Sequence, residues 1–130
     1  MSKVALVVDY SMLIRYSLCC FLEKRGFVVV SAIDGTEALE KLARTRPDLI
    51  VTDMKMPKMS GSEFITVLKN RPETANVPIV VVTSNVDGCG DAEKRADFAI
   101  YKDIDIESQL EKALSTLPCM AKANRQTAGK

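Results

Sequence analysis

Residues 49–61 read Leu49-Ile50-Val51-Thr52-Asp53-Met54-Lys55-Met56-Pro57-Lys58-Met59-Ser60-Gly61. The apolar run predicts a strand that delivers the carboxylate of Asp53 to a turn built from Pro57 and Gly61. In open α/β sheets, ligands bind at the edge formed by the carboxyl ends of the strands. An aspartate that only caps a strand is the alternative, because Asp is common in loops. Other polar side chains follow apolar runs in the same way, which favours a site: Asp9, Thr83, Ser84 and Lys102.

Five short apolar runs alternate with helical patterns along the chain. The runs are rich in β-branched residues and lack polar alternation, as in strands buried on both faces: Val4–Val8, Phe27–Val30, Leu49–Val51, Ile79–Val82 and Phe98–Tyr101. Apolar stripes at helical spacing lie between or after them: Ile14–Leu22 stopped by Gly26, Ala38–Ala43 ended before Pro47, Phe64–Leu68, and Ile106–Leu117 closed by Pro118. This alternation predicts an α/β fold, a doubly wound five-stranded parallel sheet with helices on both faces.

Length and composition indicate one globular domain. With 130 residues, 47% of them hydrophobic, the chain is long enough to bury a core. We place the domain at residues 1–118 and expect a flexible C-terminal tail at residues 119–130, which have little apolar content. The net charge of +1, from 18 basic and 17 acidic residues, predicts no direct nucleic acid binding and no attraction to a membrane. No apolar run is long enough to span a bilayer, so we expect a cytoplasmic protein.

The histidine and cysteine content excludes some classes of enzyme and argues against a zinc site or a disulfide. The chain has no histidine, which excludes Ser-His and Cys-His hydrolases within it. The cysteines have no metal-ligand spacing, so we interpret them as free thiols: Cys19, Cys20, Cys89 and Cys119. A zinc site or a disulfide is the less favoured interpretation of this spacing.

The residues at the ends of the apolar runs also carry a family resemblance. Over residues 3–117 the chain resembles a receiver domain of the response-regulator family, which has the CheY-like, flavodoxin-like fold. Val7-Val8-Asp9-Tyr10-Ser11 resembles the family's first-strand acidic motif, and Asp53, with Met56-Pro57 following, falls on the phosphoacceptor position. The remaining matches fall on the family's phosphate-binding residues: Thr83, Ser84 and Lys102.

The resemblance implies phosphoryl transfer to Asp53. The carboxylate would attack the phosphorus of a phosphohistidine, on a histidine kinase or phosphotransfer protein, or of a small acyl phosphate, and would form an aspartyl phosphate. Lys102 and Thr83 would bind phosphoryl oxygens. Mg²⁺ would be held by Asp9, Asp53 and the backbone carbonyl of Lys55. Such a domain is no enzyme beyond its own phosphorylation and dephosphorylation.

Three positions near the acceptor should tune the chemistry. Tyr10 stands where the family has its second acidic residue, so we expect weak Mg²⁺ binding, reduced roughly ten- to a hundredfold if this ligand matters as much as an outer-shell partner. The Lys55 side chain lies two residues past the acceptor, and contact with the phosphoryl group and simple solvation are equally expected. Asn85 would orient or block the hydrolytic water. We therefore expect these residues to set the lifetime of the phosphoryl group.

The signalling face departs more strongly from the family pattern. Ala99 stands three residues before Lys102, where the family has an aromatic switch residue. Asp103 replaces the proline that normally follows the lysine in a cis bond. Since a non-proline cis bond costs ~3 kcal/mol, we expect a trans bond here. Gly88 and Gly90 predict that the fourth helix is short or irregular.

Two functions remain open from the sequence. The first is a phosphoacceptor receiver domain of a two-component phosphorelay, which signals to an unknown downstream protein as a monomer or weak dimer. The second is a degenerate receiver that binds proteins independently of phosphorylation, as Tyr10 and Ala99 suggest. Retention of Asp53, Thr83 and Lys102 favours the first. A flavodoxin-like cofactor binder is disfavoured, because no glycine-rich phosphate loop follows the first strand.

Overall fold

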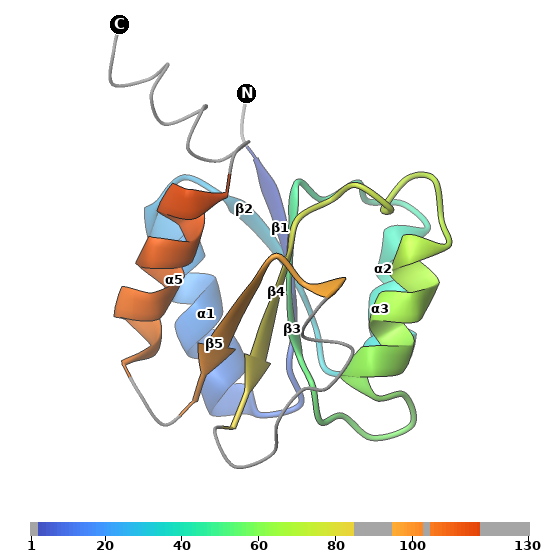
Figure 1. Cartoon of the computed structure of the whole chain (residues 1–130), viewed down its shortest axis with the longest axis horizontal. Helices are drawn as coiled ribbons and strands as arrows, with labels where there is room; N and C mark the ends of the chain where they lie inside the picture. The colour runs from blue at the N-terminus through green and yellow to red at the C-terminus, as the bar shows by residue number, and fades with distance from the viewer. Residues whose placement is uncertain (1–2, 85–94, 103–104, 118–130) are drawn as a thin grey trace, which may run out of the picture.

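A computed structural model describes residues 3–84, 95–102 and 105–117, in which strands and helices alternate as the sequence predicts (Figure 1). The strands are β1 Val4–Val8, β2 Val28–Ala32, β3 Leu49–Asp53, β4 Ile79–Thr83 and β5 Phe98–Tyr101. The helices are α1 Met12–Lys24, α2 Gly35–Leu42, α3 Gly61–Lys69 and α5 Ile106–Thr116. The predicted irregular fourth helix, the Lys102–Asp103 bond and the predicted tail at 119–130 lie outside the described residues.

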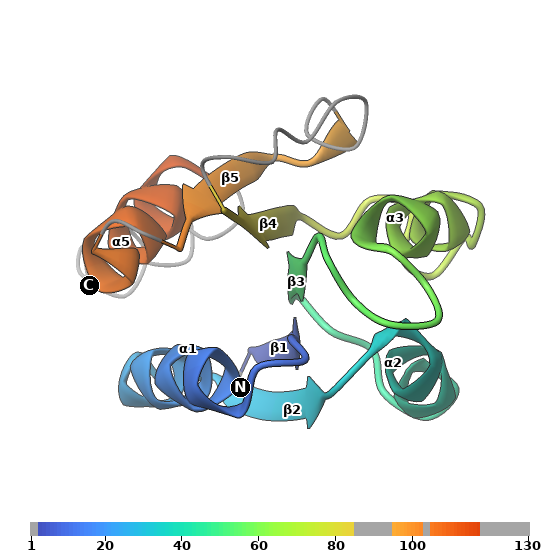
Figure 2. The same cartoon turned by 90° about the horizontal axis from the view of Figure 1, so that it is seen from below.

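The strands form one parallel sheet in the order β2-β1-β3-β4-β5. Helices α1 and α5 cover one face of the sheet, and α2 and α3 cover the other (Figure 2). The predicted doubly wound five-stranded sheet is therefore confirmed. The chain runs from β1 outward to β2 and then crosses back to β3 on the far side of β1, so the winding direction reverses between β1 and β3. In such sheets a crevice forms at the reversal, outside the carboxyl ends of the two strands.

Two central strands extend further than their apolar runs predict. Strand β3 continues to Asp53, which is in register with Val82, and β4 continues to Thr83, which is in register with Tyr101. All five residues of both strands are buried. Pairing with a neighbouring strand thus carries two polar residues into the sheet, and it fixes their backbones more firmly than a loop would.

The first crossover shows why β2 begins one residue later than predicted. Helix α1 ends at Lys24, and Gly26 adopts φ 93°, a left-handed conformation that costs glycine nothing. The N–H group of Phe27 then donates to the Leu22 carbonyl at 3.1 Å. Phe27 therefore completes the end of α1, and the ladder with β1 starts at Val28.

The core has one apolar cluster on each face of the sheet. On the face covered by α1 and α5 it includes Leu18, Leu22, Leu110, Ala113, Val51 and Val80. On the face covered by α2 and α3 it includes Phe64, Ile65, Leu68, Ala38, Leu6 and Val8. Full burial of a side chain such as Phe64 stabilises the fold by ~1.5–3 kcal/mol. Among the described residues, no helix has the length and apolar character needed to cross a bilayer.

Candidate functional site

Four strands bring polar side chains to one edge of the sheet, the lower edge in Figure 1. Asp9 follows β1, Asp53 ends β3, Thr83 ends β4 and Lys102 follows β5. The Nζ atom of Lys102 lies 3.1 Å from Oδ1 of Asp53 and 3.9 Å from Oδ2 of Asp9. The structure thus brings together two carboxylates and one ammonium group that are separated by many residues in the sequence.

Backbone and side-chain hydrogen bonds fix the position of Asp9. Its N–H donates to the Ala32 carbonyl at 3.1 Å, and its Oδ1 accepts from the N–H of Ser11 at 2.9 Å. The Arg15 guanidinium donates to the Asp9 carbonyl at 2.8 Å. Ser11 also caps α1, accepting from the N–H of Ile14. A serine two residues past an aspartate and just before an apolar stripe is a signal for this turn, whereas nothing in the sequence indicates the role of Arg15.

The loop after Asp53 is held against the end of β3. The N–H of Lys55 donates to Oδ1 of Asp53 at 3.3 Å, and the N–H of Gly61 donates to the Met54 carbonyl at 2.9 Å. A Cβ atom on Gly61 would lie 2.5 Å from the Asp53 carbonyl oxygen and 2.7 Å from Cα of Met54. Glycine at this position therefore lets α3 begin directly on the backbone of Asp53, with Ser60 as the N-cap.

The other predicted site residues surround this edge. Thr83 is buried at the end of β4, and its hydroxyl donates to the carbonyl of Ser84, which is half-buried, at 3.4 Å. The side chains of Lys55 and Tyr10 are exposed, Tyr10 at 60%. Asn85 lies outside the described residues. The floor of the site is therefore polar and buried, whereas Lys55 and Tyr10 lie at its exposed rim.

Burial dominates the electrostatics of Asp9. The residue is completely buried, and its Oδ2 atom has no hydrogen-bond partner among the described residues. The pKa of Asp9 is raised from 3.8 to about 6, mainly by burial and then by the negative charge of Asp53, while the N–H of Ser11 and the ammonium of Lys102 act in the opposite direction. This oxygen has the Lys102 ammonium 3.9 Å away but no hydrogen bond, and a buried carboxylate oxygen without a hydrogen bond is a candidate ligand for a cation.

The donor atoms at this edge fit Mg²⁺. The carboxylates of Asp9 and Asp53 and the carbonyl of Lys55 are hard oxygen ligands, the type that Mg²⁺ prefers, and this ion usually keeps several waters. Within the described ranges, no group of three or more His, Cys, Asp or Glu side chains is placed to hold a metal ion. A Mg²⁺ site here would therefore have few protein ligands, and Oδ2 of Asp9, which has no hydrogen bond among the described residues, is the candidate among them.

We expect Asp9 to contribute more stability to the metal-free protein as the pH falls from 7 towards 4. The raised pKa of Asp9 means that the folded state binds a proton at a pH where the unfolded chain has released it. For Asp9 alone, the gain between pH 7 and pH 4 is about 2 kcal/mol, because the full effect of the raised pKa is reached only below the ordinary value of 3.8. Thermal unfolding of the wild type and Asp9→Asn across this range measures it. The variant should lose this gain, and parallel pH profiles for the two proteins would contradict the prediction.

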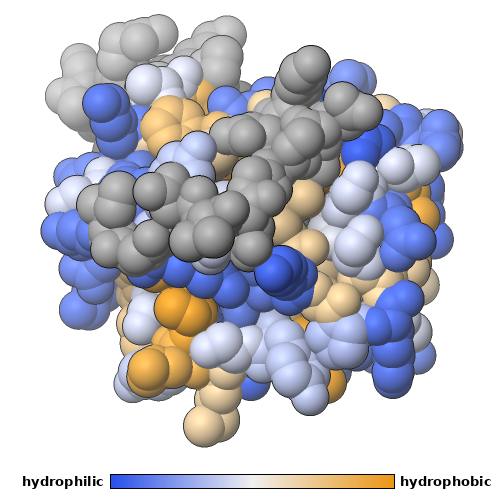
Figure 3. All heavy atoms as spheres, turned by 60° about the horizontal axis from the view of Figure 1, so that its bottom comes forward, coloured by the Kyte–Doolittle hydropathy of each residue, from blue (hydrophilic) through white to orange (hydrophobic). Residues whose placement is uncertain are grey.

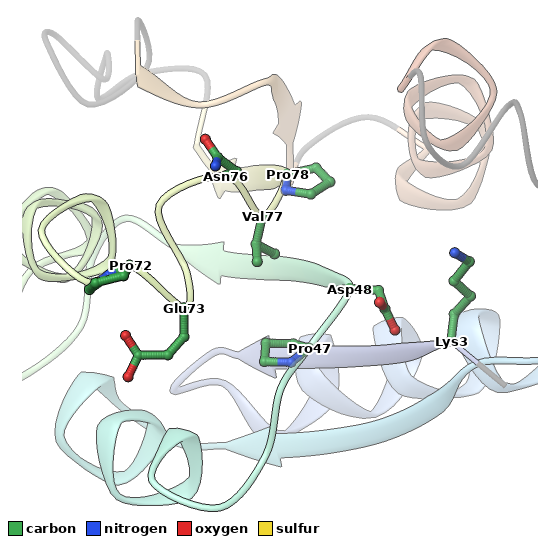
Figure 4. Close-up of a pocket in the computed structure, with 8 residues that line it drawn as sticks. All are labelled: Lys3, Pro47, Asp48, Pro72, Glu73, Asn76, Val77 and Pro78. Atoms are coloured by element: carbon green, nitrogen blue, oxygen red, sulfur yellow. The ribbon is translucent and has the colours of Figure 1, made fainter. Parts of the chain in front are cut away.

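A groove of about 250 Å³ lies at the opposite edge of the sheet, where the strands begin (Figure 4). Its lining comes from segments that precede β1, β3 and β4: Lys3, Pro47, Asp48, Pro72, Glu73, Asn76, Val77 and Pro78. The Asp48 carboxylate is engaged, because its Oδ2 accepts from the N–H of Val4 at 2.8 Å. Because the groove lies at the edge where the strands begin, it is remote from Asp53 and takes no part in the candidate site.

An apolar patch lies beside the candidate site at the start of α1. We call it the α1 patch, and its members are exposed by 60% to 74%: Tyr10, Met12, Leu13 and Tyr16. Figure 3, which brings the carboxyl edge of the sheet forward, shows orange and tan atoms gathered in its lower left part. Clustered large apolar side chains on a surface mark contact sites for other proteins.

Comparison with known proteins identifies the family to which this fold and this candidate site belong. The family model of the response regulator receiver domain matches residues 5–115. The chain therefore belongs to the response regulator receiver family, whose members are signalling modules of two-component systems rather than classical enzymes. The resemblance drawn from Asp9, Asp53 and Lys102 is thereby confirmed at the level of the family.

The chain is similar to several characterised relatives. It is 36% identical over 89 residues to Protein PilG of Pseudomonas aeruginosa, a match that covers 68% of this chain and 65% of PilG. The chain spans 65% of the length of PilG, 37% of the phosphate regulon transcriptional regulatory protein PhoB of Klebsiella pneumoniae and 4% of hybrid signal transduction histidine kinase D of Dictyostelium discoideum.

Solved structures agree with this assignment. The chemotaxis response regulator CheY4 of Vibrio cholerae superposes with a TM-score of 0.81 at 29% identity, over 90% of this chain and all of that one. The receiver domain of the sensor histidine kinase PA1611 of Pseudomonas aeruginosa has a TM-score of 0.77 at 22% identity, over 88% of this chain and 96% of that one. The second likeness shows the fold alone.

Proposed function

We propose that this receiver domain accepts a phosphoryl group on Asp53 from a histidine kinase or a phosphotransfer protein and signals by contact with another protein. The observation that carries the proposal is the 3.1 Å contact between Nζ of Lys102 and Oδ1 of Asp53, beside the buried carboxylate of Asp9. An ammonium group at this distance would bind an oxygen of a phosphoryl group carried by Asp53. A carboxylate that only caps a strand would need no such partner.

The transfer depends on positioning more than on proton chemistry. A carboxylate oxygen of Asp53 would form a bond to phosphorus, while the bond from phosphorus to the donor nitrogen breaks and that nitrogen keeps the electron pair. Lys102 would bind one phosphoryl oxygen, and the Thr83 hydroxyl would donate a hydrogen bond to another. Both groups are held by strands that pair with each other, and the N–H of Lys102 donates to the Thr83 carbonyl at 2.8 Å.

Three oxygen donors at the same edge of the sheet would hold a metal ion during transfer. Asp9, Asp53 and the carbonyl of Lys55 would bind Mg²⁺, which neutralises negative charge on a transferred phosphoryl group. The unpartnered Oδ2 atom of Asp9 supports this assignment. The solved receiver domain of PA1611 has a magnesium ion coordinated in its active site cleft, which agrees with the proposal.

The surroundings of Asp53 favour a protein as the phosphoryl donor. The α1 patch begins at Tyr10, next to Asp9, so a protein that docks at this edge of the sheet would bury exposed apolar side chains. Burial of such side chains contributes much of the affinity between proteins. The free thiols of Cys19 and Cys20 agree with the reducing environment of the cytoplasm, where such donors act.

A degenerate receiver that binds proteins without phosphorylation is the second candidate. Tyr10 favours it, because a tyrosine at the second acidic position removes one anionic ligand from the metal site. Ala99 favours it as well, because β5 lacks the aromatic switch residue of the family pattern. The two candidates differ in one respect that can be measured, namely whether Asp53 reacts.

Two-dimensional NMR with beryllofluoride and Mg²⁺ tests the proposal, because beryllofluoride on a carboxylate mimics a phosphoryl group. We expect the amide signals of Asp53, Thr83 and Lys102 to shift together, since all three would contact the added group. Mg²⁺ without beryllofluoride is the control. If the mixture shifts no signal near Asp53, or shifts only residues of the groove in Figure 4, Asp53 is not a phosphoacceptor and the degenerate receiver is the better function.

A further inference from the structure

Arg95, three residues before the start of β5, connects that strand to α3. Its Nη1 atom donates to Oγ1 of Thr66 at 2.7 Å, and its Nη2 atom donates to Oγ and O of Ser62 at 3.1 and 3.2 Å. The Thr66 hydroxyl donates in turn to the Ser62 carbonyl at 3.1 Å. One guanidinium group thus binds three oxygens of α3, and we call this arrangement the Arg95 clamp.

The α3 end of the clamp is joined to the phosphoacceptor. Ser62 follows Gly61, whose lack of a Cβ atom lets α3 begin against the carbonyl of Asp53 and Cα of Met54. The N–H of Gly61 also donates to the Met54 carbonyl at 2.9 Å. Because these atoms are in close contact, a shift of the first turn of α3 moves the backbone that carries Asp53.

The other end of the clamp is joined to Lys102. Hydrogen bonds in both directions lock the start of β5 to β4: the Asp97 N–H donates to the Ile79 carbonyl, and the Ile79 N–H donates to the Asp97 carboxylate, each at 2.8 Å. At its far end, β5 leads directly into Lys102. Among the strands that the structure describes, β5 lies at the edge of the sheet and pairs only with β4, so the clamp is a tie to α3 that this sheet does not provide.

We propose that Arg95 is a positioning residue, which couples α3 to β5 and thereby sets the position of Lys102 relative to Asp53. The inference rests on the proposed function, since it concerns the geometry of the same site. Nε of Arg95 is buried and has no hydrogen-bond partner among the described residues, so all the hydrogen bonds that hold the guanidinium to α3 come from its two Nη atoms. The clamp also joins Asp53 to the strand on which Ala99 replaces an aromatic side chain.

Phosphorylation kinetics of clamp variants test the proposal. Arg95→Gln should slow formation of the Asp53 adduct with acetyl phosphate and Mg²⁺ by roughly two- to thirtyfold, the range expected when a coupling residue is lost. Thr66→Val removes one acceptor and should give a smaller change in the same direction, and Arg95→Lys should restore part of the rate because it keeps a cationic donor. Arg46→Gln, an exposed arginine at the opposite edge, is the matched control. Thermal unfolding confirms that each variant is folded at the assay temperature.

The amide signals of the unphosphorylated protein provide a second measurement. Arg95→Gln should shift the signals of Met54 and Lys102, whereas Arg46→Gln should leave both in place. If the wild type forms no adduct, the proposed function fails, and these signals alone decide whether the clamp couples the two residues. Unchanged signals in that case, or an unchanged rate for Arg95→Gln in a wild type that does react, would overturn the role of Arg95.

Discussion

Replacement of Asp53 by asparagine is expected to abolish phosphoryl uptake completely. The wild type, incubated with millimolar acetyl phosphate and Mg²⁺, should gain the mass of one phosphoryl group. Asp53→Asn should gain none, because an amide cannot form the acyl phosphate bond. Lys102 would remain at the site, so loss of the adduct would reflect the missing carboxylate and not the missing counter-charge. Intact-mass spectrometry of both proteins measures the result.

Asp48→Asn is the matched control for this experiment. Asp48 lies at the opposite edge of the sheet, and an asparagine there still accepts the hydrogen bond from the N–H of Val4. This variant should form the adduct as the wild type does. A folded wild type that gains no mass would contradict the phosphoacceptor proposal and favour the degenerate receiver. An adduct that persists in Asp53→Asn would place the reaction on another carboxylate, with Asp9 the nearest.

Tyr10→Asp is expected to tighten Mg²⁺ binding roughly ten- to a hundredfold, the effect of restoring a ligand or a strong outer-shell partner. The substitution returns a hard oxygen and a negative charge beside Asp9 and Asp53. The loss of packing should be small, because the Tyr10 side chain is 60% exposed. Without metal, the added charge should raise the pKa of Asp9 further. Calorimetric titration of the wild type and the variant with Mg²⁺, at fixed ionic strength, measures the change.

Tyr16→Asp controls for the charge itself, because Tyr16 is also exposed in the α1 patch but lies further along α1. It should change Mg²⁺ affinity much less than Tyr10→Asp. If the two variants behave alike, Tyr10 is a bystander and Asp9 holds the direct-ligand position alone. In that case the alignment of Tyr10 with the second acidic residue of the family is wrong.

The sequence predicts the strands and the meeting of Asp9, Asp53 and Lys102 for one physical reason. Apolar runs buried on both faces belong to parallel strands, and parallel strands joined by helices place their carboxyl ends at one edge. Any polar residue that ends such a run therefore reaches the same place. This argument needs no knowledge of packing, which is why it succeeds with residues that lie far apart in the chain.

The contacts that hold the site in place depend on packing, and the sequence does not reveal them. Arg95 and Ser62 are 33 residues apart, and they meet only because α3 and the start of β5 lie side by side. Arg15 reaches the carbonyl of Asp9 because α1 turns back over β1, and its side chain has no partner that a pattern of charges would indicate. The extension of β3 to Asp53 likewise follows from pairing with β4 and not from apolar character.

The place of Lys102 in the chain has a consequence for how the molecule assembles. Asp9 follows β1 and Asp53 ends β3, whereas the lysine that lies close to both follows β5, the last strand along the described part of the chain. Until β5 joins β4, the two buried acids repel each other without this counter-charge. The two acids therefore gain their counter-charge only when β5 has paired with β4, so correct pairing of this edge strand is a condition for a complete site.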